Sequence, residues 1–176
     1  MARTEQIEFC NSIKAMMPQY FNSVRVLDIG SLDINGNNRY LFTDSEYIGI
    51  DIGAGNNVDV VCSGHLFTTD EQFDVVISTE CFEYDKHFAD TIRNVVNNLL
   101  KPGGLFLFTC ATTGRPEHGT TRTSRKDSPF TNDYYKNLTV DDIKAEVDID
   151  KEFFTHEFKA RLEWPQDLYF YGIKHG

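Results

Sequence analysis

The sequence predicts one α/β domain, residues 1–176, in which helices pack on a layered sheet. Two observations support this: short apolar segments alternate with segments of helical periodicity, and two aromatic-rich segments near the end suit a hairpin. A composition of 40% hydrophobic and 25% charged residues is typical of a soluble globular chain with one buried core. We distinguish an N-terminal helix (1–20), a core (24–112), a loop (113–138) and a C-terminal helix with a strand pair (139–176).

The first predicted element is a helix over residues 4–17. An apolar stripe at spacings of three and four runs along it, and Pro18 follows where a helix would end. Four apolar segments then predict strands, at 24–29, 47–50, 58–62 and 73–78. Only residues 52–57 separate the second strand from the third, whereas a crossover helix takes about a dozen residues or more. Either that helix is reduced to a turn or the third strand is misassigned.

A second helix is expected over residues 88–100. The sequence Lys101-Pro102-Gly103-Gly104 ends it, because proline and glycine both oppose helix continuation. The continuously apolar segment 105–110 is typical of a central strand in a parallel sheet. Residues 111–137 lack helical periodicity, and a loop of this length in a compact domain is usually functional.

The last part of the chain predicts a short helix and two strands. Thr139 and Asp142 resemble a capping pair at the start of a helix that runs through Val147. The two aromatic-rich strands are expected at 153–159 and 168–174. These two strands are the pair that suits a hairpin.

Charge and cysteine usage narrow the classes of function. The net charge of −10 argues against a general nucleic-acid binder, because phosphate backbones repel an acidic surface. No apolar run approaches the roughly 20 residues of a membrane span, and the N-terminus does not resemble a secretory signal. The four cysteines lie far apart without Cys-x-x-Cys spacing, so we expect no zinc site and a reducing, cytoplasmic setting. The acidic residues show no metal-ligand spacing, so we assign no metal-ligating residue and leave a requirement for a divalent metal open.

The most informative motif is the turn after the first strand. Asp28 lies at the end of a buried apolar run, Gly30 follows, and Asp33 to Gly36 complete a polar loop. Gly30 permits backbone angles that a side chain forbids and lets a ligand approach the chain closely. Open α/β sheets bind ligands at this edge. The alternative is an ordinary turn without a ligand.

A second acidic residue favours a nucleoside ligand. Asp51 ends the second strand about 20 residues beyond the glycine turn, the spacing at which a carboxylate accepts ribose hydroxyl protons. The alternative is that Asp51 only caps the turn at 53–55. A nicotinamide cofactor is disfavoured, because the Gly-x-Gly-x-x-Gly that seats a pyrophosphate on a helix N-terminus is absent.

With these motifs, the chain resembles the class I S-adenosylmethionine-dependent methyltransferases. Four segments carry the resemblance in the family's order: 26–31 (VLDIGS), 47–51 (YIGID), 73–78 (FDVVIS) and 99–104 (LLKPGG). The resemblance covers about residues 24–112, which become the cofactor-binding core, with 113–138 as an acceptor-side loop. It implies a Rossmann-like fold with a mostly parallel seven-stranded sheet, a C-terminal antiparallel hairpin and helices on both faces.

The resemblance also implies roles for individual residues. Asp28 and the Gly30 turn would face the methionine part of S-adenosylmethionine, Asp51 the ribose, and residues 63–65 the adenine. Residues 78–84 would form the opposite wall, near the sulfonium. The cofactor-binding residues predicted in this way are Asp28, Gly30, Ser31, Asp51, Ile52, Gly64, His65, Ser78 and Thr79.

The sequence departs from the family's pattern at two points. Leu32 stands where many members have a second glycine, and Gly36 offers the backbone freedom instead. Tyr84, in Phe82-Glu83-Tyr84, stands where many relatives have a histidine.

Methyl transfer to oxygen requires a base for the hydroxyl proton. Candidates lie in residues 80–87, after the fourth strand, and in 114–120, after the fifth. We favour His118, which titrates near neutrality in a loop with glycine and proline on either side, with Glu83 and Asp85 as the other candidates. The alternative for His118 is a solvated side chain without a role.

Cationic and aromatic residues in the loop suggest the acceptor. Arg115 and Arg122 favour an anionic or hydroxyl-rich acceptor such as a sugar or glycan, and Tyr134 and Tyr135 would stack on sugar faces. The alternative is a mobile lid with solvated charges. The leading hypothesis is therefore a methyltransferase, O-directed, acting on a glycan or another small polar acceptor. The alternatives are a nucleic-acid or protein acceptor, and a cofactor-binding domain without catalysis.

Overall fold

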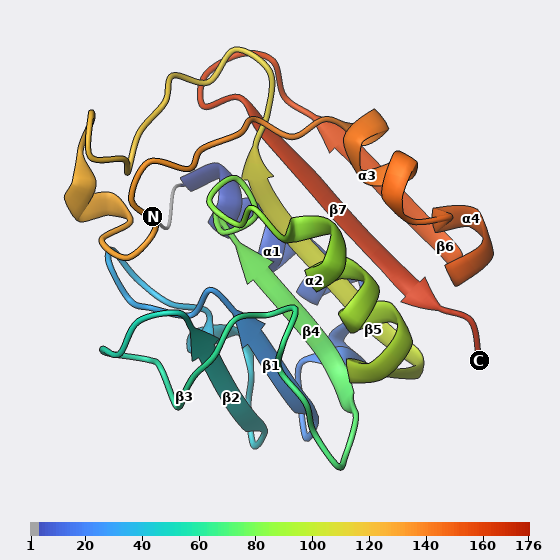
Figure 1. Cartoon of the computed structure of the whole chain (residues 1–176). Helices are drawn as coiled ribbons and strands as arrows, with labels where there is room; N and C mark the ends of the chain where they lie inside the picture. Colours follow the sequence, from blue (N-terminus) through green and yellow to red (C-terminus); the bar gives the residue numbers. More distant parts are fainter. Residues whose placement is uncertain (1–3) are drawn as a thin grey trace.

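A seven-stranded sheet forms the centre of the computed structural model, which describes residues 4–176 (Figure 1). The strands are β1 (Arg25–Ile29), β2 (Glu46–Asp51), β3 (Val60–Val61), β4 (Phe73–Thr79), β5 (Leu100–Ala111), β6 (Phe153–Ala160) and β7 (Asp167–Lys174). Their order is β3-β2-β1-β4-β5-β7-β6, and β7 runs antiparallel to both of its neighbours. The mostly parallel sheet and the C-terminal antiparallel hairpin are thus confirmed.

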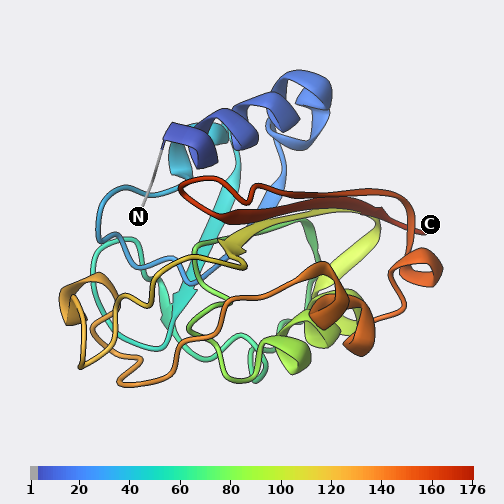
Figure 2. The ribbon, with the colours of Figure 1, turned by 90° about the horizontal axis from the view of Figure 1, so that it is seen from above.

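Helices cover both faces of this sheet, as expected (Figure 2). On one face lies α1 (Thr4–Met16), with the 3-10 turns η1 (Pro18–Tyr20) and η2 (Arg39–Leu41) beside it. On the other face lie α2 (Phe88–Asn94), α3 (Val140–Glu146) and α4 (Ile149–Glu152). Because strand side chains alternate, Val26 belongs to the core cluster that includes Cys10 of α1, whereas the adjacent Leu27 belongs to the cluster that includes Ile92 of α2.

Three predicted elements have boundaries that differ from the observed ones. The third strand is only β3, two exposed residues, and a turn without a helix joins it to β2, which is the first alternative above. The second predicted helix is α-helical only to Asn94 and continues as a π-helical turn, η3 (Val95–Leu99). The predicted strand 105–110 starts earlier than expected, because the Lys101–Gly104 segment is already part of β5, where the pairing with β4 shifts register.

The C-terminal elements follow the prediction closely. Thr139 caps α3: its hydroxyl accepts from the Asp142 amide, and the Asp142 carboxylate accepts from the Thr139 amide, which confirms the capping pair. The loop 113–138 contains the single 3-10 turn η4 (Arg125–Asp127) and extends from the end of β5 across the ends of β1 and β2 (Figure 1). Within residues 4–176, no helix has the length and apolarity to cross a membrane.

Candidate functional site

A cleft of about 660 Å³ opens at the carboxyl ends of β1, β2 and β4. Its walls are the three strand ends, the segment after β3, the segment after β4, and residues 127–134 of the loop 113–138. Gln6 of α1 also contributes to the lining. Eight of the nine cofactor-binding residues predicted from the sequence line this cleft: Asp28, Gly30, Ser31, Asp51, Ile52, Gly64, His65 and Thr79.

Asp28 is a buried carboxylate at the base of the cleft, 2% exposed. Its Oδ2 accepts hydrogen bonds from the Tyr47 hydroxyl and from Asn38 Nδ2, the latter at 3.2 Å. Burial raises the pKa of Asp28 to about 7, against the lowering effect of these two donors. The cleft therefore contains a carboxyl group that ionises near neutral pH and whose partners are neutral.

The Gly30 turn brings the main chain close to the end of β2 and to the segment that follows β4. The amide groups of Gly30 and Ser31 donate to the Ile50 carbonyl at 2.9 and 3.0 Å. Gly30 has a φ of 78°, and a Cβ at this position would lie 2.6 Å from the Cβ of Cys81. Only glycine fits here, because a side chain would meet both the unfavourable φ and the neighbouring residue.

Asp51 both caps its turn and faces the cleft. Its Oδ1 accepts from the Gly53 amide at 3.1 Å and its Oδ2 from the Leu32 amide at 3.2 Å, and burial raises its pKa. Each carboxylate oxygen has a second lone pair, so these bonds leave acceptor capacity toward a ligand. Ile52, 46% exposed, places an apolar side chain on the adjoining wall.

The segment after β3 forms a compact wall against the start of α2. The Gly64 carbonyl accepts from Asn94 Nδ2 at 2.8 Å, and a Cβ on Gly64 would lie 2.6 Å from the Thr91 methyl carbon. The rings of His65 and His87 are in contact, with centroids 4.1 Å apart and planes tilted by 31°. His87 is also the N-cap residue of α2.

Ser78 and Thr79 are adjacent in sequence, but only Thr79 faces the cleft. Thr79 lines the cleft, and its hydroxyl accepts from Asn38 Nδ2 at 3.0 Å. Ser78 is fully buried and donates to the Ile29 carbonyl at 2.9 Å, so it ties β4 to β1 beneath the cleft. Strand alternation explains why only one of two successive residues faces the ligand side.

The acceptor-side prediction for Arg115 disagrees with its position. Its side chain is 1% exposed and pairs with Glu80 at 2.9 Å and with Asp167 at 2.5 Å. Arg115 does not line the cleft; it joins the loop 113–138 to the ends of β4 and β7. Arg122 is exposed, pairs with Glu117 and Asp133, and does not line the cleft either. Neither guanidinium points to an anionic acceptor.

The three candidate catalytic residues lie in different surroundings. Glu83 is fully buried outside the cleft lining, and burial together with the neighbouring Glu80 raises its pKa well above the usual range. His118 also lies outside the lining, with Nε2 3.2 Å from a nitrogen of Arg115. Asp85 lines the cleft, but its carboxylate accepts from the His87 amide and the Thr91 hydroxyl at the start of α2.

The two predicted tyrosines are also separated. Tyr134 lines the cleft, whereas the Tyr135 ring packs beside Tyr84 and His118 with centroid distances of 5.7 and 5.3 Å. Tyr84 lines the cleft from the other side of this aromatic group. Tyr135 therefore supports the wall and Tyr134 forms part of it.

Sequence reasoning did not single out two residues of the cleft. Asn38 bridges Asp28 and Thr79, and Phe130 reaches from the loop 113–138 to pack against Gly53. Neither lies in a segment with a recognisable motif, although the length of the loop pointed to the region of Phe130. No group of three or more metal-ligating side chains is present in the described part of the chain.

Comparison with known proteins defines the fold. No protein-family model and no curated protein sequence matches the chain. The structure resembles 1,6-didemethyltoxoflavin-N1-methyltransferase of Burkholderia thailandensis, solved with S-adenosylhomocysteine, at TM-score 0.64 and 14% identity over 95% of this chain and 76% of that one. It also resembles the N-methyltransferase NodS of Bradyrhizobium japonicum, likewise solved with S-adenosylhomocysteine. The TM-score is 0.60 and the identity 13%, over 98% of this chain and 88% of that one.

A third similar structure is phosphoethanolamine N-methyltransferase 2 of Haemonchus contortus, solved with S-adenosylmethionine. It has a TM-score of 0.63 and 15% identity over 94% of this chain, which spans 53% of that protein. Together with the strand order and the antiparallel β7, these likenesses show that the chain has the Rossmann-like fold of class I methyltransferases.

Proposed function

We propose that the protein is an S-adenosylmethionine-dependent methyltransferase acting on a small acceptor. The observation that carries the proposal is the common position of Asp28, Gly30 and Asp51 in one cleft, at the ends of adjacent strands. Similar structures of the same fold contain S-adenosylmethionine or its homocysteine product, which supports the choice of cofactor. When bound, this cofactor supplies the electrophilic methyl group.

The residues of the cleft fit such a ligand part by part. Asp28 and the Gly30 turn would hold the amino acid portion, because a carboxylate and close backbone suit a charged, flexible group. Asp51 would accept the ribose hydroxyl protons, and Ile52 with residues 63–65 would flank the adenine. The region between Thr79 and the loop 113–138 is then left for the acceptor.

The predicted acceptor classes and the candidate bases can be compared with the residues that line the cleft. The sequence favours a sugar or glycan hydroxyl because of Arg115 and Arg122, but neither arginine lines the cleft and each guanidinium pairs with two carboxylates of the chain. A nucleic-acid acceptor is disfavoured by the net charge of −10. The assignment of proton transfer to His118, Glu83 or Asp85 stays a prediction, and only Asp85 lines the cleft. A cofactor-binding domain without catalysis would bind the cofactor and transfer no methyl group.

Titration calorimetry with S-adenosylhomocysteine tests the proposal. We expect binding to the unmodified protein and a loss of about tenfold or more in affinity for Asp51→Ala, because a charge-assisted hydrogen bond to the ribose is removed. Asp70→Ala is the matched control, since Asp70 is exposed and lies outside the cleft lining. Absence of binding to the unmodified protein, or equal affinities of the two variants, would contradict the proposal.

A further inference from the structure

Phe130 reaches from the loop 113–138 to the turn that follows β2. A Cβ added at Gly53 would lie 2.0 to 2.5 Å from three atoms of the Phe130 ring, so the ring rests directly on this glycine. Gly53 is buried, although its neighbours Ile52 and Ala54 are exposed. Its φ is not positive, so the ring rather than the backbone conformation excludes a side chain here.

The Phe130 ring forms part of the cleft wall without filling the cleft. Phe130 is 47% exposed and lines the cleft together with Ile52, which is 46% exposed. With the ring in this position the cleft still measures about 660 Å³, which is within the range of small-molecule sites. Two exposed apolar side chains are therefore available to a ligand beside the Asp51 carboxylate.

Hydrogen bonds hold the segment that carries Phe130 in a compact turn. The hydroxyl groups of Ser128 and Thr131 are hydrogen-bonded, 2.5 Å apart, and the Thr131 amide donates to the Ser128 carbonyl at 3.3 Å. The ring is thus presented by a short turn with its own internal bonds.

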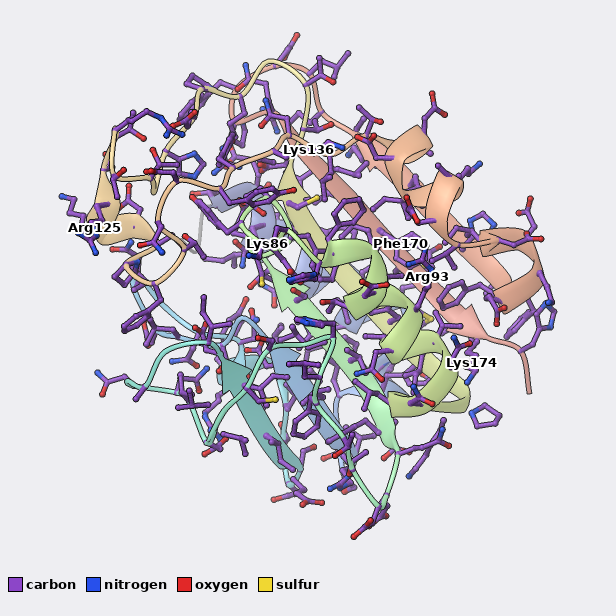
Figure 3. All side chains as sticks on the ribbon, viewed as in Figure 1. Lys86, Arg93, Arg125, Lys136, Phe170 and Lys174 are labelled. Atoms are coloured by element: carbon purple, nitrogen blue, oxygen red, sulfur yellow. The ribbon has the colours of Figure 1, made fainter. Side chains whose placement is uncertain are left out.

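Charges do not tie this segment to the strand ends. Arg125, at the start of η4, lies on the outer side of that turn (Figure 3). In the described part of the chain, the hydrogen bonds and ion pairs of residues 127–134 all stay within the loop 113–138. Packing, including that of Phe130 on Gly53, therefore places the segment beside the cleft.

We propose that Phe130 binds the nucleoside part of S-adenosylmethionine by placing its ring against the adenosine. This inference rests on the proposed methyltransferase function. The position of the ring favours the nucleoside over the other parts of the cofactor, because Gly53 donates its amide hydrogen to Asp51, the carboxylate assigned to the ribose. Aromatic side chains stack on nucleobases, since every base has a π-face. The loop predicted to face the acceptor thus also contributes to the cofactor site.

Two ligands that share the nucleoside test this role by titration calorimetry. S-adenosylhomocysteine contains both the nucleoside and the amino acid portion, whereas methylthioadenosine lacks the amino acid portion. Phe130→Ala should weaken both ligands by a similar factor, about tenfold, because the lost contact is with the part that they share. Unchanged affinities, or a loss confined to S-adenosylhomocysteine, would overturn the proposal. Tighter binding would also overturn it, since the ring would then obstruct the ligand.

Phe154→Ala is the matched control for the loss of an exposed phenylalanine. Phe154 is 62% exposed, lies on β6 and is not part of the cleft lining. The control should change neither affinity by more than about twofold. A loss as large as that of Phe130→Ala would show that the effect does not arise in the cleft and would overturn the role of Phe130.

Gly53→Ala tests whether the ring acts from its place on Gly53. The three atoms nearest to the added Cβ all belong to the Phe130 ring, so the ring must move. We expect Gly53→Ala to weaken methylthioadenosine at least about fivefold in the otherwise unmodified chain, and less than about twofold when Phe130 is already replaced by alanine. Equal losses in both backgrounds would overturn the proposal.

Failure of this inference can be distinguished from failure of the proposed function. If Phe130→Ala binds both ligands as the unmodified protein does while Asp51→Ala binds them more weakly, only the role of Phe130 is overturned. If neither ligand binds to the unmodified protein, the methyltransferase proposal is contradicted, and the inference that rests on it is contradicted as well.

Discussion

The cleft buries one carboxylate on each side, and the two are stabilised in different ways. Asp28, on the cofactor side, is 2% exposed and accepts hydrogen bonds from the neutral donors Asn38 and Tyr47. Glu80, on the acceptor side, has a side chain that is 4% exposed and pairs with the guanidinium of Arg115. The cofactor side therefore contains a group that can lose its charge near neutral pH, whereas the acceptor side depends on a buried ion pair.

Removing the cation of the acceptor side should have the largest effect. Arg115→Met leaves Glu80 and Asp167 buried without their guanidinium partner, and breaking a buried pair in this way costs about 3–5 kcal/mol. We expect the free energy of unfolding in urea to fall by that amount. Arg122→Met is the matched control, because Arg122 pairs with exposed carboxylates and such pairs contribute about 0–1 kcal/mol. Similar losses for the two variants would show that the buried pair is not what stabilises this side.

The same difference explains what could be predicted from sequence. On the cofactor side, the important groups lie within a few residues of a strand end, so the motifs at Asp28, Gly30 and Asp51 located them. On the acceptor side, Arg115 meets Glu80 and Asp167 across 35 and 52 positions of sequence. Local patterns do not encode such pairings, and Arg115 therefore looked like a ligand-binding residue.

Local sequence patterns also fail to predict some of the helix and strand ends. The apolar stripe of residues 88–100 continues past Asn94, so periodicity alone does not reveal the change from α2 to the wider turn η3. The edge strand β3 is shorter than its apolar segment, because its only neighbour in the sheet is β2 and the pairing covers two residues. Pairing with β2, rather than hydrophobicity, decides the ends of β3.

Gly30 lies where the two sides meet, and its replacement should have an intermediate effect. Gly30→Ala adds a Cβ that would lie 2.6 Å from the Cβ of Cys81, at a φ of 78°. We expect the free energy of unfolding to fall by about 2–3 kcal/mol. This is the sum of the cost of a positive φ for a residue with a Cβ and the cost of overpacking against Cys81. Gly103→Ala is the matched control, since Gly103 has a φ of 76° and open space around its Cβ position. It should cost about 1 kcal/mol, and an equal cost for both would exclude the contact with Cys81 as the cause.

The smallest effect concerns the titration of Asp28 on the cofactor side. Burial raises the pKa of Asp28 from 3.8 to about 7, so in the window between these values the folded chain binds a proton that the unfolded chain has released. The contribution of Asp28 to stability therefore falls as pH rises through this window, by about 1.4 kcal/mol for each pH unit, and is constant below and above it.

The variant Asp28→Asn has no carboxyl group that titrates at this position. Urea unfolding of both proteins at about pH 5 and pH 6 measures the difference in slope, and equal slopes would show that the Asp28 carboxyl ionises in the folded chain near its ordinary pKa. A neutral Asp28 below pH 7 would also bind a cationic amino group less tightly, so ligand binding on the cofactor side should weaken as pH falls below 7.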